Sequence, residues 1–468
     1  MKRIFRSGVI LLLVFVFLVG IFAREAGAMT TEEEKKLGQK VLLEMSREVE
    51  FVRDLTLQAF VDRVGYALVA QVPSTPFDYK FYIVNSPEAN AFAIPGGAIF
   101  VTTGLLVMAD DEPEVAGVLS HEISHVQGRH VSQMIERSKK LSLATLAAIL
   151  AGALLGGGGK TSEAAAMTAM AAQGALTLKY SREMETDADQ NSLQYLIKAG
   201  YDPKGIIIFL NRINKISMNS TSKVPAYLLS HPVTENRISL LENLLQSGQT
   251  PLSPDRAVGG YKKIQARAFV AEREPHVAVS HFQSMTNAHP EDTDGYYGLG
   301  LAYRRMGRLD KSMETFEKAH DLAPEDRDIL AEVGEAYFLT GKLDEAAEHL
   351  EAAQSIQART GGTNDLSTLY YLGRTYQEEG EFAKALPLLL KVQERVPEFI
   401  DVQHNLGSLY GRMGKKGLSH FYFGKYFKLR GEVPNAVLHF RQALGYLEPG
   451  SPEREEVQRE IRTLTQAR

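Results

Sequence analysis

The sequence predicts a mostly helical α+β domain with a small sheet, followed by an all-α solenoid of repeated helix pairs. Three observations carry this prediction: apolar residues at helical spacing in the first half, two short β-rich runs within that half, and a glycine pattern of period 34 in the second half. The chain has 468 residues, of which 44% are hydrophobic and 23% are charged. This composition is globular, and the length indicates two domains or more.

The first 28 residues have the features of a signal peptide. A basic start is followed by an uncharged apolar run at 9–23 and by the small residues Ala26-Gly27-Ala28. We expect cleavage after Ala28 and export to the periplasm of a bacterial envelope. The apolar run is shorter than the about 20 residues that span a membrane, so an uncleaved signal anchor is the less favoured alternative. The expected divisions are a signal peptide at 1–28, the α+β domain at 29–250, a linker at 251–260 and the solenoid at 261–468.

Composition excludes several classes of protein. The chain contains no cysteine, so it has no disulfide, no zinc finger and no thiol nucleophile. Any metal must therefore bind to His, Asp and Glu side chains. The formal net charge is −5, which disfavours nucleic acid as a partner because phosphates require a basic surface.

The first half of the sequence predicts two helices, then two strands, then a further helix. Residues 31–71 place apolar side chains at helical spacing and should form two helices. The run at 77–84 and the run at 98–103, which follows Pro95-Gly96-Gly97, predict two strands. Residues 112–137 should form one helix, with Pro113 suited to its first turn.

An apolar run at 141–155 precedes four consecutive glycines and allows more than one interpretation. It is short and alanine-rich for a transmembrane helix, and the glycines form a flexible break. A buried or partly buried hairpin is the simpler interpretation. Peripheral membrane contact and a flexible cover near the active site are the alternatives, because exposed apolar patches mark interaction surfaces.

Beyond residue 260 the chain is built from repeats. Five glycines are each followed by a second glycine seven residues later: Gly300, Gly334, Gly373, Gly407 and Gly424. Segments that begin Leu-Gly-x-x-Tyr and close on proline resemble tetratricopeptide repeats, in which small residues let two antiparallel helices approach closely. The spacing of 39 between Gly334 and Gly373 predicts a loop insertion at 359–364. The spacing of only 17 between Gly407 and Gly424 indicates one helix shared by two repeats, or a truncated unit. A degenerate first repeat fits 261–290.

The strongest chemical signal is His121-Glu122-Ile123-Ser124-His125. On a helix, two imidazoles at i and i+4 lie one turn apart on the same face, so both can reach one zinc ion. Glu122 projects beside them, where it can act as general base on an attacking water. A solvated helix face that happens to carry two histidines is the alternative.

A zinc hydrolase needs a third protein ligand. The densest acidic stretch downstream is 181–190, in which Glu185 and Asp189 stand one turn apart. We interpret Glu185 as the third ligand and Asp189 as the acceptor that fixes the tautomer of a ligand histidine. A solvated acidic helix is the simpler alternative, and Glu183 and Asp187 are expected on such an exposed face.

Several motifs in order give a family resemblance. They are NAFAxPGG at 90–97, TGLL at 103–106, HEISHVQGRH at 121–130, SREMETDADQ at 181–190, AGYDP at 199–203 and HP…R at 231–237. Together they resemble the HtpX-like and CAAX-prenyl-protease-like zinc metallopeptidases. The resemblance implies a gluzincin-type endopeptidase with one zinc on His121, His125 and Glu185, Glu122 as general base and Asp189 in support. It also implies that the strand after Pro95-Gly96-Gly97 is a sheet edge that pairs with an extended substrate.

His231, in the sequence His231-Pro232, is the most ambiguous site residue. It can be a loop histidine that only orders the chain, a donor to the developing oxyanion, or a plug that occupies the open position of zinc and keeps an enzyme latent. The plug is narrowly favoured. Arg237, further along the same segment, is expected to position the loop or a substrate carbonyl.

Two functions of different class follow. The leading one is a zinc endopeptidase that degrades misfolded or stalled envelope and outer-membrane proteins, with the repeats docking substrate or an assembly complex at the outer membrane. The second is a periplasmic chaperone or adaptor whose zinc site is latent or structural. An intact Glu122 favours the enzyme, because a structural zinc site has no use for a general base.

Overall fold

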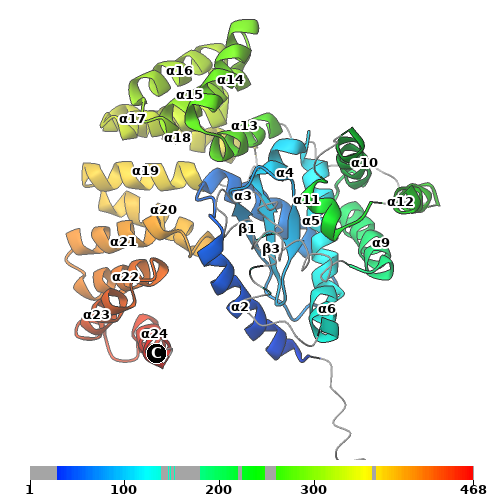
Figure 1. Cartoon of the computed structure of the whole chain (residues 1–468). Coiled ribbons are helices and arrows are strands. Elements are labelled where there is room, and N and C mark those ends of the chain that lie inside the picture. The colour runs from blue at the N-terminus through cyan, green and yellow to red at the C-terminus, as the bar shows by residue number, and fades with distance from the viewer. Residues whose placement is uncertain are drawn as a thin grey trace, which may run out of the picture.

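A computed structural model describes residues 29–138, 146, 148, 152, 180–219, 224–233, 235–247, 260–360 and 365–466. The predicted signal peptide at 1–28, residues 251–259 of the predicted linker at 251–260 and residues 361–364 of the predicted insertion at 359–364 lie outside these residues. So does most of the apolar run at 141–155, of which Leu146, Ala148 and Gly152 are described. Among the described helices, none is long and apolar enough to cross a membrane. The α+β part followed by an all-helical solenoid, which the sequence predicts, is confirmed (Figure 1).

The described residues begin with the two predicted helices, α2 (Thr31–Glu48) and α3 (Leu55–Val69). Thr30 and Glu33 form a capping box at the start of α2, and the Asp54 carboxylate accepts hydrogen bonds from the backbone N–H groups of Thr56 and Leu57 at the start of α3. These caps satisfy N–H groups that have no partner within the helix. Both helix starts are therefore encoded locally.

The sheet has three strands in the order β1-β3-β2, formed by β1 (Lys80–Val84), β2 (Ala91–Ala93) and β3 (Ala98–Thr102). β3 pairs in parallel with β1 and antiparallel with β2. The strand after Pro95-Gly96-Gly97 is β3, and the expectation that it lies at the sheet edge is wrong. β3 is the central strand, and the edge strands are β1 and β2. Gly96 and Gly97 have φ values of 87° and 104°, which suit the tight β2–β3 turn and allow this three-residue strand to pair back.

The predicted single helix at 112–137 is also wrong in one respect. After α4 (Thr103–Met108), the chain forms α5 (Glu112–Gln127), turns at Gly128 and Arg129, and continues as α6 (His130–Ser138). Asp111 caps α5, and Pro113 lies in its first turn as predicted. Arg129 has a φ of 54°, a left-handed conformation that ends a regular helix. The break redirects the chain immediately after the histidine motif.

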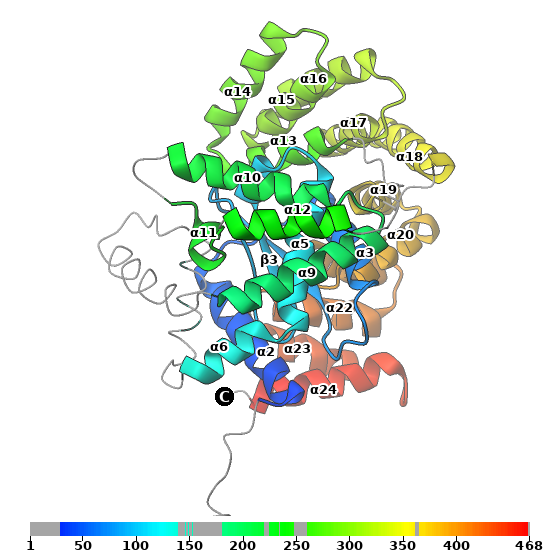
Figure 2. The same ribbon diagram turned by 90° about the vertical axis from the view of Figure 1, so that its right-hand side faces the viewer.

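Helix α5 runs through the middle of this part of the molecule. It contacts β2, β3 and α3 on one side, and α9 (Arg182–Lys198) and α10 (Lys204–Asn219) on the other. Figure 2 shows α9, α10 and α12 (Glu235–Ser247) crossing in front of it, with the short α11 (Ala226–Ser230) beside them. Every residue from Val115 to Val126 is buried, so the histidine motif lies inside the protein.

The second half contains twelve helices in the described ranges, arranged as antiparallel pairs. They are α13 (Tyr261–Glu272), α14 (Pro275–Ala288), α15 (Thr293–Arg305), α16 (Leu309–Leu322), α17 (Arg327–Leu339), α18 (Leu343–Thr360), α19 (Leu366–Glu379), α20 (Phe382–Arg395), α21 (Ile400–Arg412), α22 (Lys416–Leu429), α23 (Val433–Leu444) and α24 (Pro452–Gln466). We refer to residues 260–466 as the solenoid and to residues 29–247 as the N-terminal part.

The irregular glycine spacing near the end of the solenoid now has a structural explanation. In each repeat the first glycine faces a large side chain sixteen residues later, as Gly300 faces Phe316. Helix α22 takes part in two such contacts. Its Phe423 packs on Gly407 of α21, and its Gly424 packs against Phe440 of α23. The alternative in which one helix serves two repeats is therefore confirmed.

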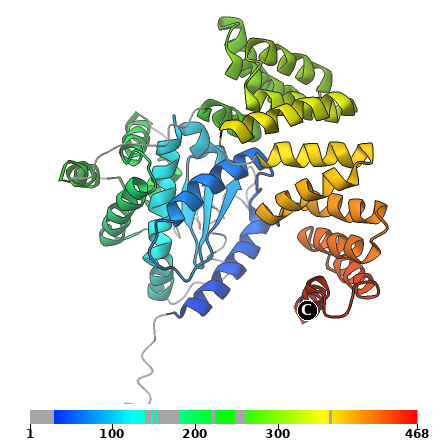
Figure 3. The same cartoon turned by 180° about the vertical axis from the view of Figure 1, so that it is seen from behind.

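The solenoid curves around the N-terminal part and contacts it at several points (Figures 1 and 3). Tyr261 of α13 lies in the core of the N-terminal part and donates a hydrogen bond to the Leu106 carbonyl. At the start of α3, Asp54 lies 3.4 Å from the buried Arg267 guanidinium, and Leu55 packs with the core of α19–α24. The start of α3 thus covers part of the solenoid surface near α13 and α19.

Candidate metal centre

Helix α5 brings the two motif histidines together inside the protein. His121 and His125 are fully buried, and their Nε2 atoms lie 3.0 Å apart. Glu185, from the first turn of α9, places Oε2 at 3.5 Å from His121 Nε2 and Oε1 at 3.6 Å from His125 Nε2. His231, which follows α11, places Nδ1 at 3.0 Å from Glu185 Oε1. One donor atom from each of the four residues lies within 4.8 Å of the others.

Glu122 lies beside this group rather than within it. Its carboxylate is fully buried, and Oε1 lies 3.4 Å from His231 Nε2. Neither oxygen accepts a hydrogen bond of good geometry from a described residue, although the Ala93 backbone N–H of β2 favours the charged form. Burial raises the pKa of Glu122, and the charges of His231 and His121 offset part of this effect. A buried carboxylate whose oxygens accept no hydrogen bond of good geometry from the described residues suits a group that takes a proton from water.

We refer to His121, His125, Glu185 and His231 as the donor group. Asp189 and Arg237 contact members of this group without belonging to it. Asp189 lies one turn after Glu185, and its Oδ1 is 3.0 Å from His121 Nδ1, so His121 is left with Nε2 toward the other donors. Arg237 of α12 donates two hydrogen bonds of 2.8 Å to Asp189 and lies 2.5 Å from Glu185 Oε2. Arg237 therefore positions two carboxylates, and its hydrogen bond of 3.1 Å to the Pro232 carbonyl fits the expectation that it positions the loop.

The electrostatics of the group are those of strongly coupled buried charges. Burial would lower the pKa of His121, but hydrogen bonds to Asp189 and Glu185 raise it to about 9. Burial and the neighbouring charge of His121 lower the pKa of His125 well below its usual value. Burial would raise the pKa of Glu185, yet His231 and His121 hold it well below its usual range. A buried carboxylate that stays ionised between imidazoles, one of them neutral, is a suitable ligand set for a divalent cation.

Three residues near the group were not identified as site residues from the sequence. Tyr180 stacks on His125 with ring centroids 3.8 Å apart, and Tyr227 stacks on His231 at 4.7 Å. His130, at the start of α6, lies with its Nδ1 at 2.8 Å from His125 Nδ1. The only available signal was the position of His130 at the end of the HEISHVQGRH motif.

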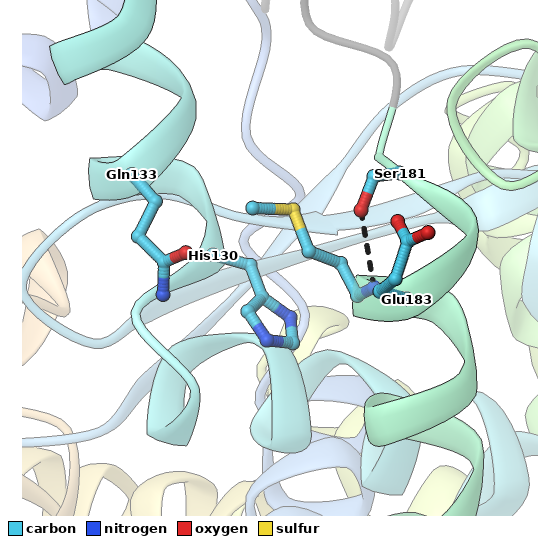
Figure 4. A pocket seen from close by; sticks show the side chains of 5 residues that line it. His130, Gln133, Ser181 and Glu183 are labelled. Atoms are coloured by element: carbon cyan, nitrogen blue, oxygen red, sulfur yellow. Dashed lines mark hydrogen bonds between the residues drawn. The ribbon is translucent and has the colours of Figure 1, made fainter.

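Next to the group, a pocket opens between the start of α6 and the start of α9 (Figure 4). It is lined by His130, Gln133, Ser181, Glu183 and Met184. Glu183 and Asp187 lie on the exposed face of α9, as predicted, but Asp187 also comes within 3.4 Å of His130 Nε2. His130 thus stands between the donor group and the pocket.

Two histidines one turn apart, a carboxylate from a second helix and a buried glutamate beside them define the site of a metallopeptidase. Comparison with known proteins agrees. The model of peptidase family M48 matches residues 52–245, and tetratricopeptide-repeat models match 293–326 and 325–398. Metalloprotease YcaL of Escherichia coli (strain K12) is 30% identical over 189 residues, which cover 40% of this chain and 69% of that protein. The chain belongs to peptidase family M48, with tetratricopeptide repeats after the peptidase part.

Two further likenesses cover less of their counterparts or carry less identity. The beta-barrel assembly-enhancing protease of Yersinia pestis is 32% identical over 222 residues, which cover 47% of this chain and 45% of that protein. The chain therefore spans less than half the length of that relative. The crystal structure of PilW, a type IV pilus biogenesis factor, is 19% identical with a TM-score of 0.34, and the match covers 44% of this chain and 96% of PilW.

Proposed function

We propose that the protein is a zinc-dependent endopeptidase of the bacterial envelope that hydrolyses misfolded or stalled envelope and outer-membrane proteins. One observation carries the proposal: His121, His125 and Glu185 converge in a buried group while the Glu122 carboxylate, also buried, is left without a good hydrogen bond. A structural zinc site would need the ligands alone.

Each residue has a distinct task in this proposal. His121, His125 and Glu185 would hold the zinc, which when bound supplies a Lewis acid for the substrate carbonyl and lowers the pKa of water. Glu122 takes the proton from the attacking water and passes it to the leaving amine. Asp189 holds His121 through Nδ1, and Arg237 holds Asp189 and Glu185 in place.

β2 is an edge strand of the sheet, and although its three residues are buried, its outer backbone groups are the proposed binding site for the substrate. β2 contacts α5, and its pairing with β3 uses the N–H and C=O groups of Phe92, so those of Ala91 and Ala93 face away from β3. An extended peptide could pair with this edge through its own backbone, whatever its side chains. Such pairing suits unfolded proteins of varied sequence.

The experiment that tests the function is analysis of cleavage products. Purified protein with zinc should cut reduced, unfolded casein at internal bonds, and mass spectrometry of the fragments should identify new termini far from both substrate ends. A chelator should stop the cleavage and added zinc should restore it. Release of single terminal residues would contradict an endopeptidase, and absence of any cleavage by zinc-loaded protein would favour the chaperone or adaptor.

His231 is proposed as a plug that restrains this activity. Its Nδ1 lies 3.0 Å from Glu185 Oε1 and its Nε2 lies 3.4 Å from Glu122 Oε1, so its ring occupies space that the substrate carbonyl and the water would need. If the unplugged state is about 1–10% populated, His231→Ala should raise the cleavage rate about 10-fold or more at unchanged zinc content.

The same variant separates the three roles of His231. An oxyanion donor predicts a fall in rate of about 10²–10³-fold, because one such donor contributes that much in the transition state. Unchanged cleavage and zinc content would leave His231 as a residue that only orders the loop.

The envelope location rests on the predicted signal peptide, and the target class rests on relatives. The Yersinia relative is named for enhancement of beta-barrel assembly, and less than half of its length is matched here. Barrel proteins that stall before assembly expose unpaired strands, which the β2 edge could bind. The periplasm is therefore the proposed compartment, and nucleic acid is not a proposed partner.

The repeats are proposed to recruit the outer-membrane assembly machinery. The start of α3 covers the solenoid near α19, so the remaining surface toward α24 is the better candidate for docking. A photo-crosslinking residue at Leu438 or Tyr446, which are 52% and 58% exposed, should trap a component of that machinery in intact cells. Leu43 of α2 is 57% exposed and is the control. Equal crosslinking of this component at all three positions, or at none, would contradict docking through the repeats.

A further inference from the structure

His130 contacts His125, and the proposed catalytic scheme gives His130 no role. The two ring nitrogens of His125 point in opposite directions: Nε2 faces His121 and Glu185, and Nδ1 lies 2.8 Å from His130 Nδ1. His121 has a comparable arrangement, with its Nδ1 on Asp189. Each of the two histidines thus has one nitrogen in the donor group and one on a partner outside it.

The backbone at Gly128 and Arg129 permits the contact between His125 and His130. Gly128 stands where a Cβ atom would come within 2.4 Å of His130 Nε2, so a larger residue would push the imidazole away. Arg129 adopts a left-handed φ of 54°, which is unfavourable for a residue other than glycine. Its guanidinium is anchored on the buried Glu34 at 2.6 Å. The turn that breaks the predicted long helix is what brings His130 back to His125.

Proton positions follow from the charges around the pair. A metal on His125 Nε2 requires the His125 proton on Nδ1, and this N–H then needs an acceptor. His130 Nδ1 can accept only if the His130 proton is on Nε2. The carboxylate of Asp187, 3.4 Å from His130 Nε2, favours that tautomer. With the opposite tautomer, His130 would donate to His125 Nδ1 and leave the proton of His125 on the nitrogen that must bind the metal.

We infer that His130 is a positioning residue that fixes the tautomer and ring orientation of His125, with Asp187 fixing His130 in turn. This inference rests on the proposed zinc site. Residues that hold metal ligands in this way typically contribute about 10–100-fold to metal affinity. The alternative is that the imidazole only fills space where α6 begins, since the neighbouring Val131 and Met134 pack with Tyr180 and Met184.

Two substitutions distinguish the hydrogen bond from space filling. His130→Phe keeps a ring but removes the acceptor. His130→Asn is smaller and keeps an oxygen near the position of Nδ1. Zinc affinity is measured by competition with a chromogenic chelator, and the absorption spectrum of the Co²⁺-loaded protein reports the ligand geometry. His289→Phe, on an exposed histidine of the solenoid, is the control.

We expect His130→Phe to weaken zinc binding about 10–100-fold and to shift the Co²⁺ bands, and His130→Asn to recover most of the loss. Zinc affinity of His130→Phe equal to that of the unaltered protein, or weaker binding by His130→Asn than by His130→Phe, would overturn the inference. Should one variant not fold, as judged by circular dichroism, the other still decides by comparison with the unaltered protein. Failure of the unaltered protein to bind zinc would instead refute the proposed site itself.

Discussion

Glu122→Gln is expected to keep the full zinc content of the protein while lowering hydrolysis of an unfolded substrate about 10²–10⁴-fold, the usual contribution of a general base. Glutamine has nearly the same shape as glutamate, and Glu122 lies beside the donor group rather than in it. The folded structure and the ligands should therefore persist while the proton acceptor is lost. Zinc content by mass spectrometry and initial cleavage rate, measured on the same sample, check this expectation.

The matched control for Glu122→Gln is Glu291→Gln, which makes the same change at an exposed carboxylate in the solenoid. Its cleavage rate should equal that of the unaltered protein. Hydrolysis by Glu122→Gln at more than about a tenth of the normal rate would contradict the role of general base.

His125→Ala is expected to lose both zinc and hydrolysis. The substitution removes a donor atom from the centre of the group and leaves the ionised Glu185 with fewer partners in a buried site. Zinc affinity should fall by more than the about 10–100-fold that outer partners contribute. Competition with a chelator measures the affinity, and His289→Ala at an exposed histidine is the control.

A zinc-replete His125→Ala protein with normal affinity would show that the metal binds elsewhere. Retained zinc with lost hydrolysis would assign His125 to the reaction rather than to the metal. Either result contradicts the ligand set of His121, His125 and Glu185.

Local patterns made much of the fold predictable. Apolar spacing identified α2 and α3, and the glycine period identified the helix pairs of the solenoid. The pairing order of the strands was not predictable in the same way. β2 has three residues, all buried, so it lacks the alternation that identifies a strand with one exposed face. Because β2 was not identified, nothing in the sequence corrected the edge position that the family resemblance implied for β3.

The donor group shows the same division between local and distant information. His121, Glu122 and His125 stand at a spacing whose geometry a helix determines, and Glu185 and Asp189 stand one turn apart on another helix. The partner of Arg237 depends on how α12 packs against α9, which spacing along the chain does not reveal. His130 could not be placed because its contact with His125 depends on the left-handed turn at Arg129.

The contact between solenoid and peptidase part was likewise beyond sequence reasoning. Asp54 caps α3 and also faces Arg267 of α13, and only the first of these roles is visible in the local sequence. The sequence predicts that Tyr261 begins a repeat, but its side chain packs in the core of the peptidase part. Truncation at residue 260 would therefore remove core residues, and for this reason single substitutions and crosslinks are the better tests of the repeats.

Titration of zinc into metal-free protein tests the central proposal most directly. The rate of internal cleavage of unfolded casein is followed together with the zinc bound per chain. The proposed site predicts that the rate rises in proportion to bound zinc and reaches its plateau at one zinc per chain. Full cleavage by protein that carries no zinc, or a plateau that comes only after a second zinc has bound, would contradict it.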